Sequence, residues 1–248
     1  MIELKSFTKQ YGKKTAVSDI SFICPDCMIT GLIGANGAGK TTILKAICGI
    51  HYPTEGAVIV DDASVEENPA NAQLNIGYVS ENAVFPENYY VLEYLKECAY
   101  LREKAGSAIL CDKESKKNQI SKMIKLFSLE SVLDKKISAL SKGYRQRLSF
   151  AQAFIHEPSI LILDEPVSGL DPFQISEMRS IIHETGKTKT VLLSTHFMQE
   201  AETLCDKIVF LHEGNKIAEG SSEEICRKAG TDNLEDAFIK LTAVTVEM

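Results

Sequence analysis

The sequence has 248 residues, of which 44% are hydrophobic and 25% are charged, as is usual for a globular protein that buries its own core. Its net charge is −7 at pH 7 and its basic residues are scattered, which argues against a nucleic-acid partner. The first residues, MIELKSFTKQ, lack the apolar core of a secretory signal, and the 7 cysteines are an odd number, so we expect reduced thiols and a cytoplasmic location. No apolar run approaches the length of a membrane span, so another chain would have to supply any such segment.

Residues 1–34 read as short strands joined by turns, ending in the apolar run 29–33. Within them, Cys24 and Cys27 flank a Pro-Asp pair. The CxxC spacing can mark a redox or metal half-site, but Pro-Asp between two strand-like runs is typical of a turn, and no second CxxC completes a zinc site. We favour the turn. A helix is predicted next, over 40–49, and then strands over 56–60 and 76–79.

The pattern then becomes helical. Apolar residues recur at helical spacing within 91–101 and 120–127, and a polar linker near 105–115 separates the two runs. Residues 86–156 are therefore predicted to form a helical insertion.

Strands return after this insertion, separated by helical stretches, at 160–163, 190–194 and 207–211. This alternation indicates an α/β domain with a mostly parallel sheet. Near the end of the chain, Asp232 and Glu235 have the spacing of a capping box. The apolar residues that follow share one helical face, and they are Leu234, Ala237, Phe238 and Leu241. We expect this tail to be a helix docked on the core.

The segment 34–41, GANGAGKT, matches the pattern G-x-x-x-x-G-K-[ST] between an apolar strand and a helix. Glycines let successive backbone N–H groups converge on phosphate oxygens, and the helix N-terminus adds partial positive charge. Lys40 would reach the outer phosphates, and the Thr41 hydroxyl would ligate Mg²⁺. The predicted nucleotide-binding residues of this loop are Gly34, Ala35, Asn36, Gly37, Ala38, Gly39, Lys40, Thr41 and Thr42.

Two neighbouring carboxylates follow the apolar run 160–163. We expect Asp164 to hold the Mg²⁺ shell and Glu165 to orient and deprotonate the attacking water. The alternative is an acidic strand end that caps the next helix. His196 ends another strand on the same side of the sheet and would contact the terminal phosphate, although a lone histidine there is often structural. The predicted catalytic residues are thus Lys40, Glu165 and His196.

A second helix start with the features of a phosphate site lies in the segment 140–147, LSKGYRQR. Ser141 is a plausible N-cap and Gly143 leaves the backbone open to an anion. One domain has no evident use for two such sites.

In this order, the motifs resemble those of the nucleotide-binding subunit of ATP-binding cassette (ABC) transporters, over nearly the whole chain. The resemblance implies one ATPase domain of the P-loop NTPase (RecA-like) α/β fold over 1–248, with an N-terminal antiparallel β subdomain and an inserted α-helical subdomain. It divides the chain into a nucleotide-binding core (1–85 and 157–225), a helical signature subdomain (86–156) and a C-terminal helical tail (226–248). ATP and Mg²⁺ are the implied ligands.

The resemblance also gives the second phosphate motif a use. Residues 140–144 match the LSGGQ-type signature, so Ser141 and Gly143 would bind the γ-phosphate held by a partner's loop in a head-to-tail dimer. The complete set of motifs favours a homodimer. Tyr11 matches the aromatic residue that stacks on adenine, and the alternative is a plain surface aromatic. Asp171, in the segment SGLD, matches the loop that communicates across the dimer, and His196 matches the switch histidine.

Two departures from the family pattern are evident. Lys142 and Tyr144 replace the second Gly and the Gln of the commonest signature, and Glu81 stands where a Gln is usual. A carboxylate there would bind Mg²⁺ more strongly but would add negative charge near the phosphates. Glu81 is therefore a predicted metal ligand, with Thr41 and Asp164. These variants, with the tail segment LEDAF, resemble the ABC-2 type export subfamily.

Three functions are compatible with these motifs. The resemblance favours an ATPase subunit, peripheral on the inner face of the cell membrane, that energises a separate permease, with export as the expected direction. A soluble ABC ATPase in cofactor assembly, or in another process without transport, is the alternative. A P-loop kinase or GTPase is disfavoured, because no guanine-reading NKxD is present and the signature segment would be unexplained. The transported substrate is left open by the sequence.

Overall fold

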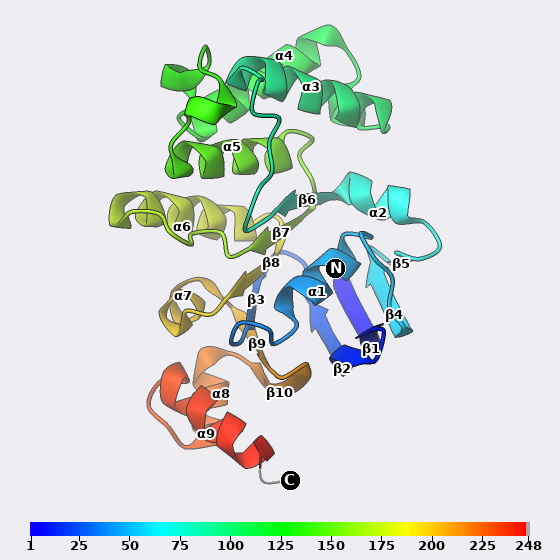
Figure 1. Cartoon of the computed structure of the whole chain (residues 1–248), viewed down its shortest axis with the longest axis vertical. Helices are drawn as coiled ribbons and strands as arrows, with labels where there is room; N and C mark the ends of the chain where they lie inside the picture. Colours follow the sequence, from blue (N-terminus) through cyan, green and yellow to red (C-terminus); the bar gives the residue numbers. More distant parts are fainter. Residues whose placement is uncertain (247–248) are drawn as a thin grey trace.

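A computed structural model describes residues 1–246, which fold around two sheets flanked by helices (Figure 1). The larger sheet has the strand order β10-β9-β3-β8-β7-β6, and the smaller sheet has the order β2-β1-β4-β5. The strands are β1 (Ile2–Tyr11), β2 (Lys14–Cys24), β3 (Ile29–Ile33), β4 (Glu55–Val60), β5 (Ala63–Ser64), β6 (Ile76–Val79), β7 (Ile160–Asp164), β8 (Thr190–Thr195), β9 (Lys207–His212) and β10 (Asn215–Gly220). The helices are α1 (Lys40–Ile47), α2 (Pro69–Asn75), α3 (Val91–Lys104), α4 (Lys113–Leu126), α5 (Lys142–Phe154), α6 (Pro172–Gly186), α7 (Met198–Leu204), α8 (Ser222–Ala229) and α9 (Leu234–Val246), with 3₁₀ turns η1 (Ala108–Leu110), η2 (Glu130–Val132) and η3 (Ile137–Ala139).

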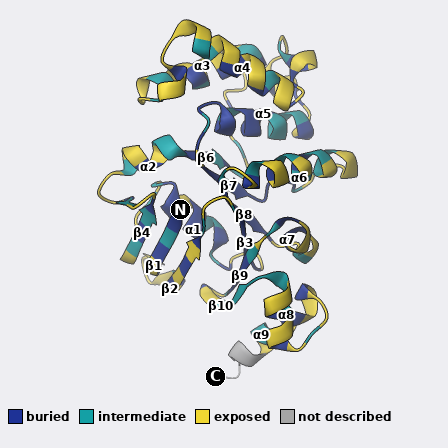
Figure 2. Cartoon of the chain, turned by 180° about the vertical axis from the view of Figure 1, so that it is seen from behind, coloured by how far each residue is buried: buried dark blue, intermediate teal, exposed yellow. Residues whose placement is uncertain are grey.

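The larger sheet is parallel except at one edge. Parallel pairing joins β9, β3, β8, β7 and β6 in that order, and β10 pairs with β9 antiparallel. Every residue of β3, β7 and β8 is buried, as the dark-blue centre of Figure 2 shows. Parallel strands present their carboxyl ends at one edge, so the residues that follow β3, β7 and β8 converge there. The predicted α/β fold with a mostly parallel sheet is confirmed.

The smaller sheet is antiparallel, as predicted for the N-terminal part of the chain, with β1 paired to both β2 and β4. Its β2 ends at Cys24 and β3 begins at Ile29, so the CxxC segment is a turn, with Cys27 at φ 53. Cys24 is buried, Cys27 is exposed, and both thiols are free. Burial raises the pKa of the Cys24 thiol to about 12, which leaves it protonated and unreactive at neutral pH.

Helices α3, α4 and α5 gather at the end of the molecule opposite the C-terminus (Figure 1), between β6 and β7 in the chain. Phe127, Phe150 and Phe154 pack there with ring centroids 5.3–6.2 Å apart. The same apolar core includes Leu161 and Leu193 of the sheet, so the inserted helices pack directly on it. The predicted helical insertion is confirmed.

The polar linker predicted near 105–115 is shorter than expected. It contains η1, and α4 already begins at Lys113. The reason is an N-cap, because one Asp112 oxygen accepts hydrogen bonds from the backbone N–H groups of Glu114 (2.8 Å) and Ser115 (2.9 Å). These polar residues start a helix rather than a loop.

The tail is a helix docked on the core, as predicted, but its N-cap lies one residue after the expected cap, Asp232. The Asn233 side chain, not Asp232, accepts from the backbone N–H of Asp236 (2.8 Å), and α9 begins at Leu234. Phe238 packs edge-on against Phe210 of β9, with centroids 5.2 Å apart. The last two residues of the predicted tail, 247–248, lie outside the described part of the chain. Within residues 1–246, no helix has the length and hydropathy needed to cross a bilayer.

Candidate functional site

The predicted phosphate loop connects the central strand β3 to α1. Gly37 and Gly39 have φ values of 85 and 103, which side chains rarely adopt. At Gly34 a Cβ atom would stand 2.3 Å from the Leu211 carbonyl oxygen of β9. These glycines let the loop curl tightly over the sheet edge, so its backbone N–H groups and the α1 N-terminus face one space.

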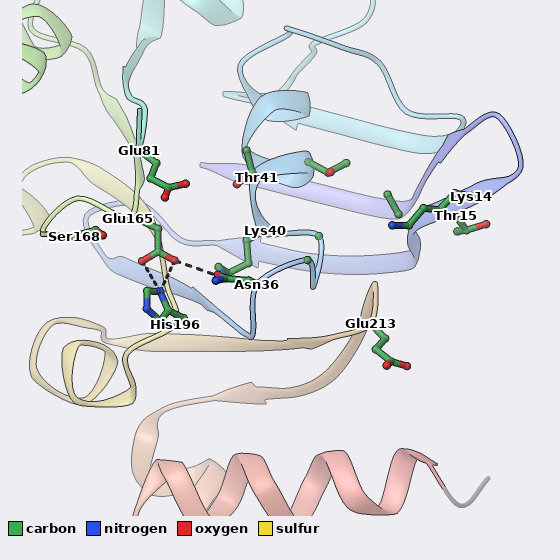
Figure 3. Close-up of a pocket in the computed structure, with 14 residues that line it drawn as sticks. Lys14, Thr15, Asn36, Lys40, Thr41, Glu81, Glu165, Ser168, His196 and Glu213 are labelled. Atoms are coloured by element: carbon green, nitrogen blue, oxygen red, sulfur yellow. Dashed lines mark hydrogen bonds and ion pairs between the residues drawn. The ribbon is translucent and has the colours of Figure 1, made fainter. Parts of the chain in front are cut away.

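Lys40 is the first residue of α1 and only 6% exposed. Its Nζ donates to the carbonyl oxygens of Gly34 (2.7 Å) and Ala35 (3.3 Å) and lies 3.6 Å from Glu165 Oε1. A buried ammonium group needs such partners. These contacts fix the Lys40 Nζ at the base of the loop, and Figure 3 shows this side chain beside Glu165.

The two acidic residues at the end of β7 take different directions. Asp164 Oδ1 accepts hydrogen bonds from Ser194 Oγ (2.6 Å) and Thr41 Oγ1 (3.4 Å), so it faces the start of α1. The Glu165 backbone turns to φ 48, and its N–H donates to the carbonyl and hydroxyl oxygens of Ser194 at 3.2 and 3.1 Å. Neighbouring carboxylates thereby reach different partners.

His196 follows β8 and meets the Glu165 carboxylate. Its Nδ1 lies 3.0 and 2.9 Å from the two carboxylate oxygens. The preceding Thr195 hydroxyl donates to the buried Glu200 (2.6 Å) and accepts from the Phe197 N–H (3.0 Å), which fixes the backbone on both sides of the imidazole. Burial raises the pKa of the Glu200 carboxyl.

These groups open into one pocket of about 960 Å³. Of the predicted residues, Asn36, Gly37, Gly39, Lys40, Thr41, Thr42, Glu81, Glu165 and His196 line it. The other lining residues were not among the predicted site residues, and they are Lys14, Thr15, Ala16, Ser168 and Glu213. In Figure 3, Glu81, Glu165 and His196 stand on one side of the pocket, and Lys14 and Thr15 on the other.

Tyr11 does not line this pocket. It is 51% exposed, at the end of β1, and pairs across the hairpin with the pocket residue Lys14. Its ring meets His51 edge-on at 6.0 Å, and Lys9 Nζ lies 5.3 Å from the ring centroid. The side chain is thus a partly exposed aromatic beside the pocket.

The signature segment also lies outside the pocket. Ser141 caps α5, as predicted, and its Oγ accepts from the Tyr144 N–H at 3.4 Å. Asp171 caps α6 by accepting from the N–H groups of Phe173 and Gln174, both at 3.0 Å. No lining residue of the pocket comes from α5 or α6, so Ser141, Gly143 and Asp171 do not complete the site within residues 1–246 of a single chain.

Comparison with known proteins identifies the family of this chain. A family model described as "ABC transporter" matches residues 17–168, more than half of the chain. The chain belongs to the ABC transporter family. It is 36% identical to the bacitracin transport ATP-binding protein BcrA of Enterococcus faecalis, over 92% of this chain and 71% of that protein. It is 33% identical to the Nod factor export ATP-binding protein I of Burkholderia orbicola, over 94% of this chain and 75% of that one.

Solved structures agree with this assignment. A structure described as the ATP binding subunit of an ABC transporter superposes with a TM-score of 0.87 and 30% sequence identity, covering 98% of this chain and 99% of that one. The predicted likeness to the ATP-binding subunits of exporters is confirmed by these relatives. The chain is therefore an ATP-binding ABC ATPase, and the pocket around Lys40 is its candidate ATP site.

The pocket around Lys40 presents oxygen atoms suited to ligating Mg²⁺. The hydroxyl of Thr41 lies beside the Asp164 carboxylate, and Glu81 lines the same pocket. Hard cations of this kind prefer hydroxyl, carboxylate and phosphate oxygens. Within residues 1–246, no group of three or more His, Cys, Asp or Glu side chains is arranged to hold a metal. The residues thus fit an ion that takes its remaining ligands from phosphate and water.

Proposed function

We propose that this chain binds Mg²⁺–ATP, dimerises, and hydrolyses the ATP to energise a separate membrane permease, with export as the direction of transport. The observation that carries the proposal is the placement of Lys40, Glu165 and His196 around one pocket beneath a phosphate loop. The names of the similar proteins, which refer to bacitracin transport and to Nod factor export, support transport as the purpose.

Six residues in or beside the pocket have a role in the proposed reaction. Glu165 takes a proton from the attacking water as the water oxygen bonds to the γ-phosphorus, and the bond to the bridging oxygen breaks to give ADP and phosphate. Lys40 offsets negative charge on the outer phosphates. His196 contacts the γ-phosphate and holds the Glu165 carboxylate through Nδ1. A bound Mg²⁺, held by Thr41, Asp164 and Glu81, would neutralise phosphate charge.

Residues outside the pocket have proposed roles as well. Tyr11 stacks on the adenine, because it pairs across the β1–β2 hairpin with Lys14, which lines the pocket. Ser141 and Gly143 bind the γ-phosphate of a partner's ATP, and Asp171 supports the α6 end that meets that partner. Ser141 and Lys142, at the start of α5, are exposed and do not line the pocket of their own chain, which supports this arrangement. Gly143 is buried against the Gln174 side chain, contrary to the open backbone expected there, so Gln174 has to move before Gly143 can meet a phosphate.

The permease is proposed to contact the surface that follows Glu81 and continues onto α3. Large apolar side chains are exposed there, among them Val84 (94% exposed), Tyr89 and Tyr100. Exposed apolar patches commonly mark protein contacts. This contact would place the chain on the inner face of the cell membrane. In the proposed division into core (1–85, 157–225), helical (86–156) and tail (226–248) segments, the contact surface would join the core to the helical segment.

A soluble ABC ATPase in cofactor assembly is the second candidate, because it can share the same ATP site. Tagging the full chain and solubilising host membranes in mild detergent separates the two. Co-purification of a stoichiometric polytopic membrane protein supports the permease, whereas recovery from the soluble fraction alone, under ATP-trapping conditions, supports the alternative.

The Glu165→Gln variant tests the proposed chemistry. Removing the base while keeping the shape of the side chain is expected to lower kcat at least 100-fold and to leave ATP binding intact. It should also trap an ATP-bound dimer, detectable by size-exclusion chromatography with light scattering. Hydrolysis at the wild-type rate would remove Glu165 from its proposed role, and a monomer at saturating ATP would contradict the shared site.

A further inference from the structure

Helix α5 touches the turn that carries the proposed base. Gln146, in its second turn, donates from Nε2 to the carbonyl oxygen of Pro166 at 2.8 Å, and the contact is partly buried. Pro166 directly follows Glu165. Figure 1 shows α5 between α6 and the α3–α4 pair, so this hydrogen bond crosses from the inserted helices to the edge of the sheet.

The backbone at this turn is strained. Glu165 has φ 48, in the left-handed region, although it is neither glycine nor asparagine. It also precedes a proline, whose ring favours extended backbone at the preceding residue. Such conformations are energetically unfavourable and persist only where the surroundings enforce them.

Hydrogen bonds enforce the turn from two directions. On the sheet side, the Glu165 N–H donates to Ser194, and the Ser168 N–H donates back to the Glu165 carbonyl at 3.2 Å. Proline has no N–H of its own to contribute. On the helix side, Gln146 binds the Pro166 carbonyl, two peptide units from the carboxylate that meets Lys40 and His196.

We propose that Gln146 is a positioning residue for Glu165, and that it transmits the position of α5 to the carboxylate. The same helix begins at Ser141, so the signature and the base of one chain move together through this bond. The inference rests on the proposed function, in which Glu165 is the base.

The neighbouring side chains on α5 provide a control. Arg147 pairs with Glu177 of α6, and Arg145 makes two 2.7 Å contacts with Glu87. These ion pairs also anchor α5, but they do not contact the turn of Glu165. A Glu177→Gln variant therefore removes an anchor of the same helix and leaves the Gln146 bond in place.

The test compares Gln146→Met and Gln146→Glu with wild type in the full-length chain. Both keep the length of the side chain, Met without a donor and Glu with a carboxylate facing the carbonyl oxygen. A displacement of a base by about 1 Å can cost about 100-fold in rate. We expect kcat for ATP hydrolysis to fall roughly tenfold for Met and more for Glu, with KM for ATP and the thermal midpoint close to wild type, and no change in kcat for Glu177→Gln.

Equal kcat in wild type and Gln146→Glu would overturn the inference, as would a loss of kcat matched in Glu177→Gln or accompanied by weaker ATP binding. Glu165→Gln, measured alongside, keeps the two proposals separate. If Glu165→Gln is inactive and Gln146→Glu is normal, only the positioning role fails. If Glu165→Gln is fully active, the proposed base is wrong.

Discussion

At the scale of single residues, the site depends on Ser194, which belongs to no recognisable sequence motif. Asp164, Glu165 and His196 could be predicted because each ends an apolar strand near a recognisable pattern. Ser194 could not, since a serine inside the run VLLST has no signature of its own. Only the pairing of β7 with β8 sets Ser194 opposite Asp164, where its hydroxyl donates to that carboxylate and accepts from the Glu165 N–H. Pairing between distant strands is not encoded in a local pattern.

The Ser194→Ala variant is expected to lower kcat about tenfold, because Asp164 loses its shortest hydrogen bond and the strained Glu165 turn loses one of its acceptors. The loss of these two buried hydrogen bonds, one of them to a carboxylate, should also lower the free energy of unfolding by about 1–3 kcal/mol. Steady-state hydrolysis and urea unfolding measure the two effects. Ser180→Ala, at an exposed position of α6, serves as the control. An unchanged kcat would show that Ser194 does not hold the carboxylates.

At the scale of elements, helix starts were predictable to within a residue or two, and their register was set by packing. The α5 cap is Ser141, as predicted, because only one capping side chain stands there. In the tail, Asp232 and Asn233 are both of residue types that can cap a helix, and Asn233 is the one that caps α9. The fully buried Leu234, whose N–H donates to Glu202 of α7 at 3.0 Å, fixes that register through contacts distant in sequence.

A buried histidine joins two elements and gives stability a pH dependence. His156 follows α5, and its Nε2 lies 3.1 Å from the Ile76 carbonyl oxygen at the start of β6. Burial, with a contribution from Arg102, lowers the pKa of His156 to about 4 in the folded state. An unfolded histidine titrates near 6.5, so the unfolded chain binds the extra proton between these two pH values. The stability tied to this group is therefore complete above pH 6.5 and is lost as pH falls towards 4.

The loss between pH 6.5 and 4 should be on the order of 3 kcal/mol, from a pKa difference of about 2.5 units. Denaturant unfolding of wild type and His156→Gln at several pH values measures it. The variant is expected to be less stable at pH 7, and its stability should fall less steeply with acid. His183→Gln, at an exposed position, should keep the wild-type slope. Parallel slopes for wild type and His156→Gln would contradict the assignment.

At the scale of the whole molecule, the alternation of strands and helices was enough to predict an α/β fold, but not the order of the strands. In the order β10-β9-β3-β8-β7-β6, most neighbours in the sheet are far apart in the chain. Such an order depends on how the connecting helices pack, and it cannot be predicted from any single segment of the sequence. The same long-range packing separates the phosphate loop from the signature within one chain. Each chain therefore supplies only half of a proposed ATP site, and the signature of a partner supplies the other half.

A mixing experiment tests that division between two chains. Lys40→Ala removes the charge under the phosphate loop, and Ser141→Arg blocks the signature, so each homodimer should be inactive. In a mixed dimer, one site carries both defects and the other carries none. Equal mixing makes about half of the dimers mixed, so about one quarter of wild-type hydrolysis should return. Recovery requires the loop of one chain to work with the signature of the other; if both acted within one chain, no mixture of the two variants would hydrolyse ATP.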